Sequence, residues 1–148
     1  MTDLEDLKQG DSIPELKVTP DKYLPHRYAG ASGDFNPIHI DREFAEQVGL
    51  PSNILHGLYS MAQVARACTT AAGGDPRSLR RLSVQFRGLG LPEQEIVVTG
   101  TANDQGVVEL EAVQLYVGLD EPAQDEPLAG VDLHAVQFSA VRARLPRS

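Results

Sequence analysis

The sequence predicts an α+β domain in which one long helix precedes a run of antiparallel strands. Between Gly57 and about Ala71, apolar and small residues recur at the three- and four-residue intervals of a single helical face. Beyond residue 81 the period changes to two, as expected of strands that are buried on one side. A helix followed by a series of strands is typical of an α+β fold. We expect one domain over residues 1–148, long enough to bury a sizeable core.

Shorter elements are expected before the long helix. Residues 13–18 (IPELKV) are a candidate first strand. Residues 19–21 (TPD) place a capping residue, a proline and an acid in the order that begins a helix, which would run to about Ala29. Asp41 is the expected N-cap of a second short helix, which Gly49 would end.

Strands are expected after the long helix. The residues 73–76 (GGDP) would end that helix. A hairpin turn is expected at 103–106 (NDQG), and an acidic loop containing proline is expected at 121–127. The predicted strands are 82–86, 96–101, 107–117 and 131–141.

Composition limits the classes of function. The net charge of −8 argues against a nucleic-acid binder, because such proteins must neutralise phosphates. No run of eighteen apolar residues occurs, so we expect no membrane-spanning helix. The acidic N-terminal segment is unlike a signal peptide, and the single Cys68 has no cysteine partner, so we expect a cytoplasmic protein. Cys68 is best explained as a small buried side chain.

The most informative segment is residues 28–45, YAGASGDFNPIHIDREFA. It places Asp34 five residues before His39, and a carboxylate with an imidazole can hold a water molecule and move its proton near neutral pH. Pro37 prevents a helix from continuing through this point, so we expect both side chains on a stiff, non-helical turn facing one pocket. Taken singly, each residue would indicate only a surface turn or a structural histidine. The ordered combination favours an acid/base pair.

This order of residues resembles the signature of the MaoC-like (R)-specific hydratase/dehydratase family. That signature runs from an aromatic residue through S/T-G-D-x-N-P-hydrophobic-His to an Ala or Ser after five further residues. The similarity extends from about Thr19 to Phe86, and more loosely to the C-terminus. It implies a hot-dog fold, in which a curved antiparallel sheet wraps around a long central helix, here Gly57 to Ala71. The matching positions are Tyr28, Ser32, Gly33, Asp34, Asn36, Pro37, Ile38, His39 and Ala45.

A second segment, residues 53–58 (NILHGL), resembles the hydrophobic-H-G-hydrophobic segment of the same family. In that family the glycine N–H binds the thioester carbonyl oxygen, which implies this role for Gly57. Physical chemistry agrees, because the first N–H groups of a helix lack partners and carry partial positive charge. Glycine also admits a close approach, as an oxyanion site requires. Standing alone, Gly57 would indicate a tight turn. His56 is expected to shape that turn, without a chemical role.

The resemblance implies (R)-specific hydration of trans-2-enoyl thioesters, and the reverse dehydration of (R)-3-hydroxyacyl thioesters, in fatty acid metabolism. Asp34 and His39 would hold and deprotonate a water, while Gly57 binds the carbonyl oxygen. Asn36 would orient the loop or the water, and Ser32 would either bond near Asp34 or cap the turn. No metal or redox cofactor is needed, because coenzyme A or phosphopantetheine is part of the substrate. The residues expected to contact the acyl chain are Leu55, Leu58, Tyr59 and Met61.

A basic cluster could meet the phosphates of such a substrate, whether acyl-CoA or an acyl carrier protein ester. It consists of Arg77, Arg80, Arg81 and Arg87, of which Arg80 and Arg81 are the candidate phosphate contacts. The simpler interpretation of any one of them is an ordinary surface arginine.

The sequence departs from the family at two positions. Ala65 stands where many members have a serine in the central helix, and Pro92 follows Phe86 later than usual. The chain most resembles the catalytic subunit of heterodimeric 3-hydroxyacyl-ACP dehydratases, whereas stand-alone hydratases of the family form homodimers. We therefore expect either a homodimer or a heterodimer with a related hot-dog subunit.

Two alternative functions stay open on the same fold. One is an acyl-CoA thioesterase, which the D-x-N-P-x-H segment disfavours because hot-dog thioesterases generally lack it. The other is a non-catalytic acyl-binding partner subunit, against which the intact Asp34 and His39 argue.

Overall fold

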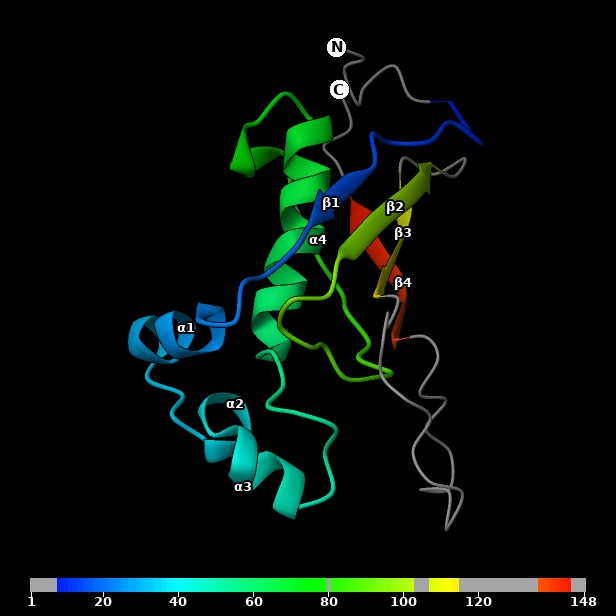
Figure 1. The fold of residues 1–148 in the computed structure, drawn as a ribbon. Helices are drawn as coiled ribbons and strands as arrows, with labels where there is room; N and C mark the ends of the chain where they lie inside the picture. Colours follow the sequence, from blue (N-terminus) through cyan, green and yellow to red (C-terminus); the bar gives the residue numbers. More distant parts are fainter. Residues whose placement is uncertain (1–7, 80, 103–106, 115–135, 145–148) are drawn as a thin grey trace, which may run out of the picture.

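A computed structural model describes residues 8–79, 81–102, 107–114 and 136–144. It has the predicted α+β architecture, in which one long helix lies against an antiparallel sheet (Figure 1). The described elements are β1 (Leu16–Val18), α1 (Leu24–Ser32), α2 (Pro37–Ile40), α3 (Arg42–Gln47), α4 (Gly57–Ala71), η2 (Pro76–Ser78), β2 (Ile96–Ala102), β3 (Val107–Gln114) and β4 (Val136–Arg144).

The sheet has the order β1-β2-β3-β4, and each neighbouring pair is antiparallel. Val18 lies opposite Ile96 at one end of β2, and Ala102 lies opposite Val108 at the other end. Along β2 every second residue is buried, beginning with Ile96. Strand β2 therefore has one face toward the core and one toward solvent, as its period of two predicted.

The core lies between α4 and the sheet. Helix α4 has the predicted bounds, and its buried residues Val64, Ala67 and Cys68 pack in one cluster with Ile96 and Val98 of β2. Small side chains on the helix let the two layers come close, which a close-packed interior requires. Among the described residues, no helix is long and apolar enough to cross a membrane.

The predicted start of the first helix is wrong. Helix α1 begins at Leu24, with Pro25 rather than Pro20 in its first turn, and Tyr23 precedes it without a side-chain cap. Pro25 fits this position because the first turn needs no N–H from it. The helix also continues past Gly30 and stops at Gly33, whose φ of 78° is the left-handed conformation that ends helices.

The remaining predictions before α4 fare better. Strand β1 is shorter than predicted, although the Ile13 N–H still donates to the Gly100 carbonyl beside it. Helix α3 is confirmed: the Asp41 carboxylate accepts the Phe44 N–H at 3.0 Å, and Gly49 has a φ of 90° just beyond the helix.

The predicted strand 82–86 is wrong. Among the described residues this segment belongs to no strand; Gln85 within it and Arg81 just before it form single β-bridges. Leu82 and Val84 still pack on the core, but Phe86 is 47% exposed. The alternation of apolar residues determines which side chains face inward. A strand forms only where its backbone also pairs with a neighbouring strand along its length.

Strands β2 and β3 are confirmed, and the described part of β4, Val136–Arg144, overlaps the predicted strand 131–141 and extends past its predicted end. Several predicted segments lie outside the described residues: the turn 103–106, residues 115–117, the loop 121–127 and residues 131–135.

Candidate active site

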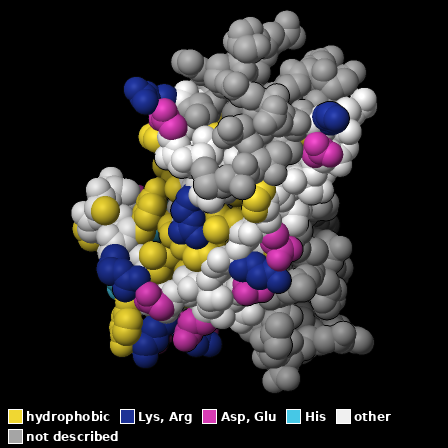
Figure 2. Space-filling view, turned by 90° about the horizontal axis from the view of Figure 1, so that it is seen from above, with side chains coloured by type: hydrophobic (Ala, Val, Ile, Leu, Met, Phe, Trp, Pro, Cys, Tyr) yellow, Lys and Arg dark blue, Asp and Glu magenta, His cyan; other side chains and the backbone are white. Residues whose placement is uncertain are grey.

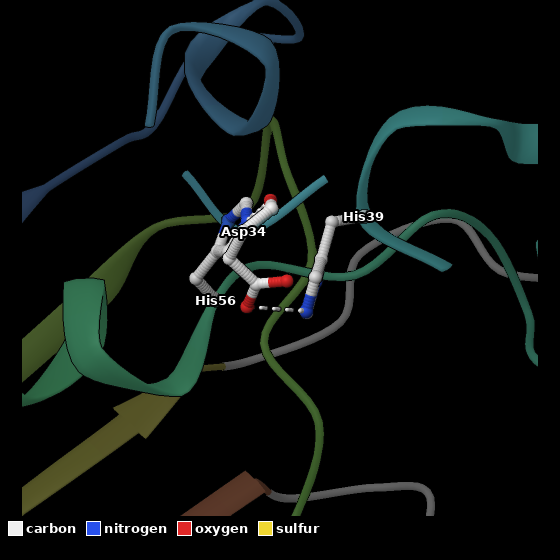
Figure 3. Close-up of side chains that lie close together, drawn as sticks. All are labelled: Asp34, His39 and His56. Carbon is white, nitrogen blue, oxygen red and sulfur yellow. Dashed lines mark hydrogen bonds and ion pairs between the residues drawn. The ribbon is translucent and has the colours of Figure 1, made fainter. Parts of the chain in front are cut away.

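Asp34 and His39 come together where the chain passes from α1 to α2. Asp34 lies in the loop after Gly33, and His39 lies on α2, with their Oδ2 and Nε2 atoms 3.8 Å apart (Figure 3). The prediction that both residues share a non-helical turn is therefore wrong for His39. Pro37 does break the chain away from α1, but it also begins α2, because a fixed φ and a missing N–H suit a first helical position.

Local hydrogen bonds fix the Asp34 side chain. Its Oδ1 accepts the Asn36 N–H at 3.2 Å, and its own N–H donates to the Ser32 Oγ at 3.2 Å. Ser32 in turn donates to the Tyr28 carbonyl at 2.8 Å. Ser32 therefore bonds beside Asp34, as one of its two predicted roles required. The Asn36 side chain accepts the Ile38 N–H and caps α2, so it orients the loop.

His39 is buried, and its partners define which ring nitrogen is free. Nδ1 lies 2.9 Å from the Ile54 carbonyl, which can only accept, so Nδ1 is the donor. The Nε2 lone pair then faces Asp34. Asn53 also anchors α2, because its side-chain amide donates to the His39 carbonyl at 2.9 Å.

The distance of 3.8 Å between Asp34 and His39 is too long for a direct hydrogen bond. One water molecule could lie within hydrogen-bond distance of both acceptors, about 2.8 Å from each. The pair can therefore accept both protons of a single water molecule.

Gly57 begins α4 beside this pair. Its N–H has no hydrogen-bond partner among the described residues, as expected for the first residue of a helix. The Phe86 ring covers the glycine closely: a Cβ at Gly57 would lie 3.3 Å from two of its ring carbons. Phe86 is thus a site neighbour that the sequence did not single out.

His56, which was expected only to shape the turn, is in direct contact with the pair. It is 3% exposed, and its ring stacks on the His39 ring with centroids 3.8 Å apart. Its Nε2 lies 3.0 Å from the Asp34 carbonyl oxygen (Figure 3). The signal available in the sequence was its place next to Gly57.

The predicted acyl-chain residues occupy different environments. Leu55 is buried in the core, where its side chain packs on Gly90. Leu58 is 61% exposed, and Met61 is half-buried. Tyr59 is half-buried with its ring edge-on to Tyr28, and burial raises the pKa of its phenol. Tyr59 is therefore linked to the site through Tyr28, which also contacts His56.

Two residues of the predicted basic cluster have partners close by in the sequence. Arg77 pairs with Asp75 at 2.8 Å, and Arg87 donates to Gln85 at 2.8 Å. Arg81 is exposed, and Arg80 lies outside the described residues.

Asp34, His39 and His56 each have a possible metal-binding atom, and these atoms lie within 4.8 Å of one another. Their contacts favour proton transfer over metal binding. The two histidine rings are stacked, so their in-plane lone pairs do not converge on a single point.

The comparisons with known proteins place this chain in a family. Residues 8–122 match the family model described as "MaoC like domain". The fatty acid synthase subunit beta of Saccharomyces cerevisiae is 33% identical over 169 residues, which cover 90% of this chain and 8% of that protein. The peroxisomal enoyl-CoA hydratase 2 of Arabidopsis thaliana is 32% identical over 91 residues, which cover 61% of this chain and 28% of that protein. The chain thus spans a small part of these relatives.

Solved structures agree on the fold. One titled a MaoC-like dehydratase has a TM-score of 0.79 at 24% identity, and the match covers 99% of this chain and 42% of that one. The ChsH1-ChsH2 complex from Mycobacterium tuberculosis has a TM-score of 0.67 at 20% identity, over 94% of this chain and 98% of the other. The chain belongs to the MaoC-like dehydratase family and has its hot-dog fold.

Proposed function

We propose that this protein catalyses the (R)-specific hydration of trans-2-enoyl thioesters and the reverse dehydration of (R)-3-hydroxyacyl thioesters. The observation that carries the proposal is the facing pair of acceptors, Asp34 Oδ2 and His39 Nε2, beside the unpartnered N–H of Gly57. Family membership supports it, and so does the likeness to an enoyl-CoA hydratase 2. The acyl group would be carried by coenzyme A or by an acyl carrier protein.

The pair would activate a water molecule. A water that donates one proton to Asp34 and one to His39 keeps its lone pairs free to attack carbon 3 of the enoyl group. As the new C–O bond forms, one water O–H bond breaks and its proton passes to the pair. The pair then returns a proton to carbon 2, so that the elements of water have added across the double bond. General acid–base catalysis of this kind contributes about 10²- to 10⁴-fold to the rate.

Gly57 would stabilise the charge that develops during this attack. When water adds to carbon 3, negative charge moves onto the thioester oxygen as an enolate. The Gly57 N–H, at the positive end of the 15-residue helix α4, would donate to that oxygen. No resident metal or redox cofactor has a part in these steps.

The direct test is turnover of a short trans-2-enoyl-CoA by the purified protein. Loss of the conjugated enoyl absorbance measures hydration, and analysis of the product's stereochemistry distinguishes the (R) from the (S) alcohol. Release of free coenzyme A would favour the thioesterase instead. A wild-type protein that is inactive on CoA esters, on acyl carrier protein esters and with added hot-dog subunits would contradict the proposal.

The Asp34→Asn variant tests the role of the carboxylate. Asparagine keeps an oxygen that can accept the Asn36 N–H, so the loop should keep its shape, but it lacks the negative charge that a base needs. We expect kcat to fall about 10²- to 10⁴-fold with little change in melting temperature. Asp41→Asn is the matched control, because this exposed carboxylate caps α3 and should leave kcat unchanged. Full activity of Asp34→Asn would exclude the assigned role.

We also propose that a second hot-dog chain completes the site, either another copy of this chain or a related subunit. Asp34 is half-exposed, and Leu58 beside Gly57 is 61% exposed. Figure 2 shows hydrophobic side chains gathered on one face of the molecule, with basic side chain atoms among them. Water exclusion strengthens an oxyanion site, so a covering chain would favour catalysis. Light scattering on the purified protein, alone and mixed with a candidate subunit, measures the assembly.

The cytoplasmic location stays a prediction.

A further inference from the structure

We infer that His56 is a positioning residue. It keeps Asp34 and His39 in a fixed position relative to each other and to Gly57. The inference rests on the proposed function and assigns a role to a side chain that the sequence had left without one. His56 touches both members of the acid/base pair, and it directly precedes Gly57.

The contact with Asp34 is a hydrogen bond across 22 residues of sequence. The carbonyl oxygen of Asp34 can only accept, so the His56 Nε2 carries the proton and donates it at 3.0 Å. Among the described residues, the other hydrogen bonds of Asp34 reach Ser32 and Asn36, within or next to its own loop. His56 is therefore the residue that ties this loop to the helix bearing Gly57.

The contact with His39 is a ring stack. The two planes are inclined by 23°, with centroids 3.8 Å apart. His39 is otherwise held by one in-plane bond from Nδ1 to the Ile54 carbonyl, which allows the ring to tilt about that bond. The flat face of His56 limits the tilt and keeps Nε2 directed at Asp34. Tyr28 packs on His56 at 4.7 Å and supports the stack.

Shaping the turn does not account for these contacts. His56 occupies the N-cap position of α4, yet its side chain makes no capping hydrogen bond there. Its Nδ1 is buried and has no partner among the described residues. A side chain that only filled space would not carry an unpartnered buried nitrogen, which costs free energy. The bond to Asp34 requires the nitrogen-bearing ring, and the stack on His39 requires its flat shape.

Two variants separate the two contacts. His56→Phe keeps a flat ring but loses the donor to Asp34, whereas His56→Gln keeps an N–H donor but loses the ring. Small misplacements of reacting groups cost about 10²-fold in rate, so we expect kcat to fall roughly 10- to 100-fold in each variant. KM should stay within about twofold, because His56 contacts the pair and not the substrate.

Ser60→Ala is the matched control. Ser60 lies one turn further along α4 and is 2% exposed, without a described contact to Asp34 or His39. A change there perturbs the same buried face of the helix, yet it should leave kcat unchanged. All variants are assayed well below their melting temperatures, so that a loss of fold is not read as a loss of rate.

Imidazole nitrogen NMR of the resting protein gives a readout that does not depend on turnover. In the wild type, His39 should show the Nδ1–H tautomer and His56 the Nε2–H tautomer. In His56→Gln, the Nδ1–H of His39 should exchange with solvent at least tenfold faster, whereas His56→Phe should protect it. A His39 spectrum unaffected by His56→Gln would overturn the inference even if the wild type hydrates nothing. So would variants with wild-type kcat in an active protein.

Discussion

At Asp34 the two oxygens of one carboxylate have different tasks. Oδ1 is tied to the Asn36 N–H, and this bond fixes the rotamer; Oδ2 is left to face His39. The two ring nitrogens of His39 also differ: Nδ1 donates to the Ile54 carbonyl, and Nε2 faces Asp34. Each group is thus held by one atom and reactive at the other, which keeps the reacting atoms in place at little entropic cost.

Cys68 should be chemically inert in the folded protein. Burial raises the pKa of its thiol to about 11, from an ordinary value of 9.0. A shift of this size leaves about a hundredfold less thiolate at pH 8, and the thiolate is the reactive form. We expect thiol-modifying reagents to label the native protein at least a hundredfold more slowly than the denatured protein. Equal labelling rates would show that Cys68 is exposed.

The same pKa shift has a consequence for stability. Because the folded-state pKa of Cys68 is raised, the folded protein binds this proton more tightly than the unfolded chain does. The contribution is complete below about pH 9 and is lost as the pH rises to about 11. Replacing Cys68 with alanine should remove this part of the pH dependence, as denaturation curves at pH 8 and pH 10.5 would measure.

The closeness of Asp34 and His39 could be predicted from the sequence, and their contacts with distant segments could not. Asp34 and His39 lie in one short segment of ordered residue types, so their proximity follows from local order. The contacts of His56 with Asp34 and of Phe86 with Gly57 join residues 22 and 29 positions apart. Such contacts depend on how segments pack, and no local pattern records them.

At the scale of elements, the start of α4 allows a test of Gly57. A methyl group there would lie 3.3 Å from two carbons of the Phe86 ring, so the ring must move or the helix start must shift. Phe86 is 47% exposed and can give way, so we expect Gly57→Ala to change the free energy of unfolding by less than about 1 kcal/mol. The shift should disturb the approach to the Gly57 N–H and lower kcat/KM at least tenfold.

Gly30→Ala is the control for that variant. Gly30 lies inside α1, and a Cβ there would meet no atom within 4 Å. Alanine should therefore raise the free energy of unfolding by about 0.5–1 kcal/mol, with activity unchanged. If Gly57→Ala were as active as Gly30→Ala, the approach to Gly57 would not matter for turnover. Steady-state kinetics with urea denaturation separates the outcomes.

Element boundaries were predictable where the stop signals are local. The glycines at 73 and 74 have positive φ values, and the helix α4 ends just before them. The start of α1 was missed because Pro20 and Pro25 are both compatible with a first turn, and only tertiary packing selects between them. The segment 82–86 has the inward alternation of a strand, but among the described residues its only pairing is a single β-bridge at Gln85, and a single sequence does not specify how far pairing extends.

For the whole molecule, the core that holds α4 against the sheet also holds the site. Gly57 and His56 lie at the start of α4, and the packing of Val64 and Cys68 further along that helix fixes its position on β2. The pair on the α2 side is joined to the helix start through Ile54 and His56. The stability of the site therefore depends on apolar contacts between α4 and β2 that do not involve the site residues themselves.

Ile96 measures how much that layer contributes. Its side chain is 1% exposed in the cluster with α4, whereas Thr99, three residues along the same strand, is exposed. Ile96→Ala should lower the free energy of unfolding by about 2–5 kcal/mol, because it removes buried apolar contacts and leaves a cavity. Thr99→Ala should change it by less than about 0.5 kcal/mol. Urea denaturation at one fixed protein concentration is the measurement, because any association of chains would add to the apparent stability. If the two substitutions lowered the free energy of unfolding equally, the face of β2 that carries Ile96 would not be packed against α4. The stability of the site would then not depend on this core.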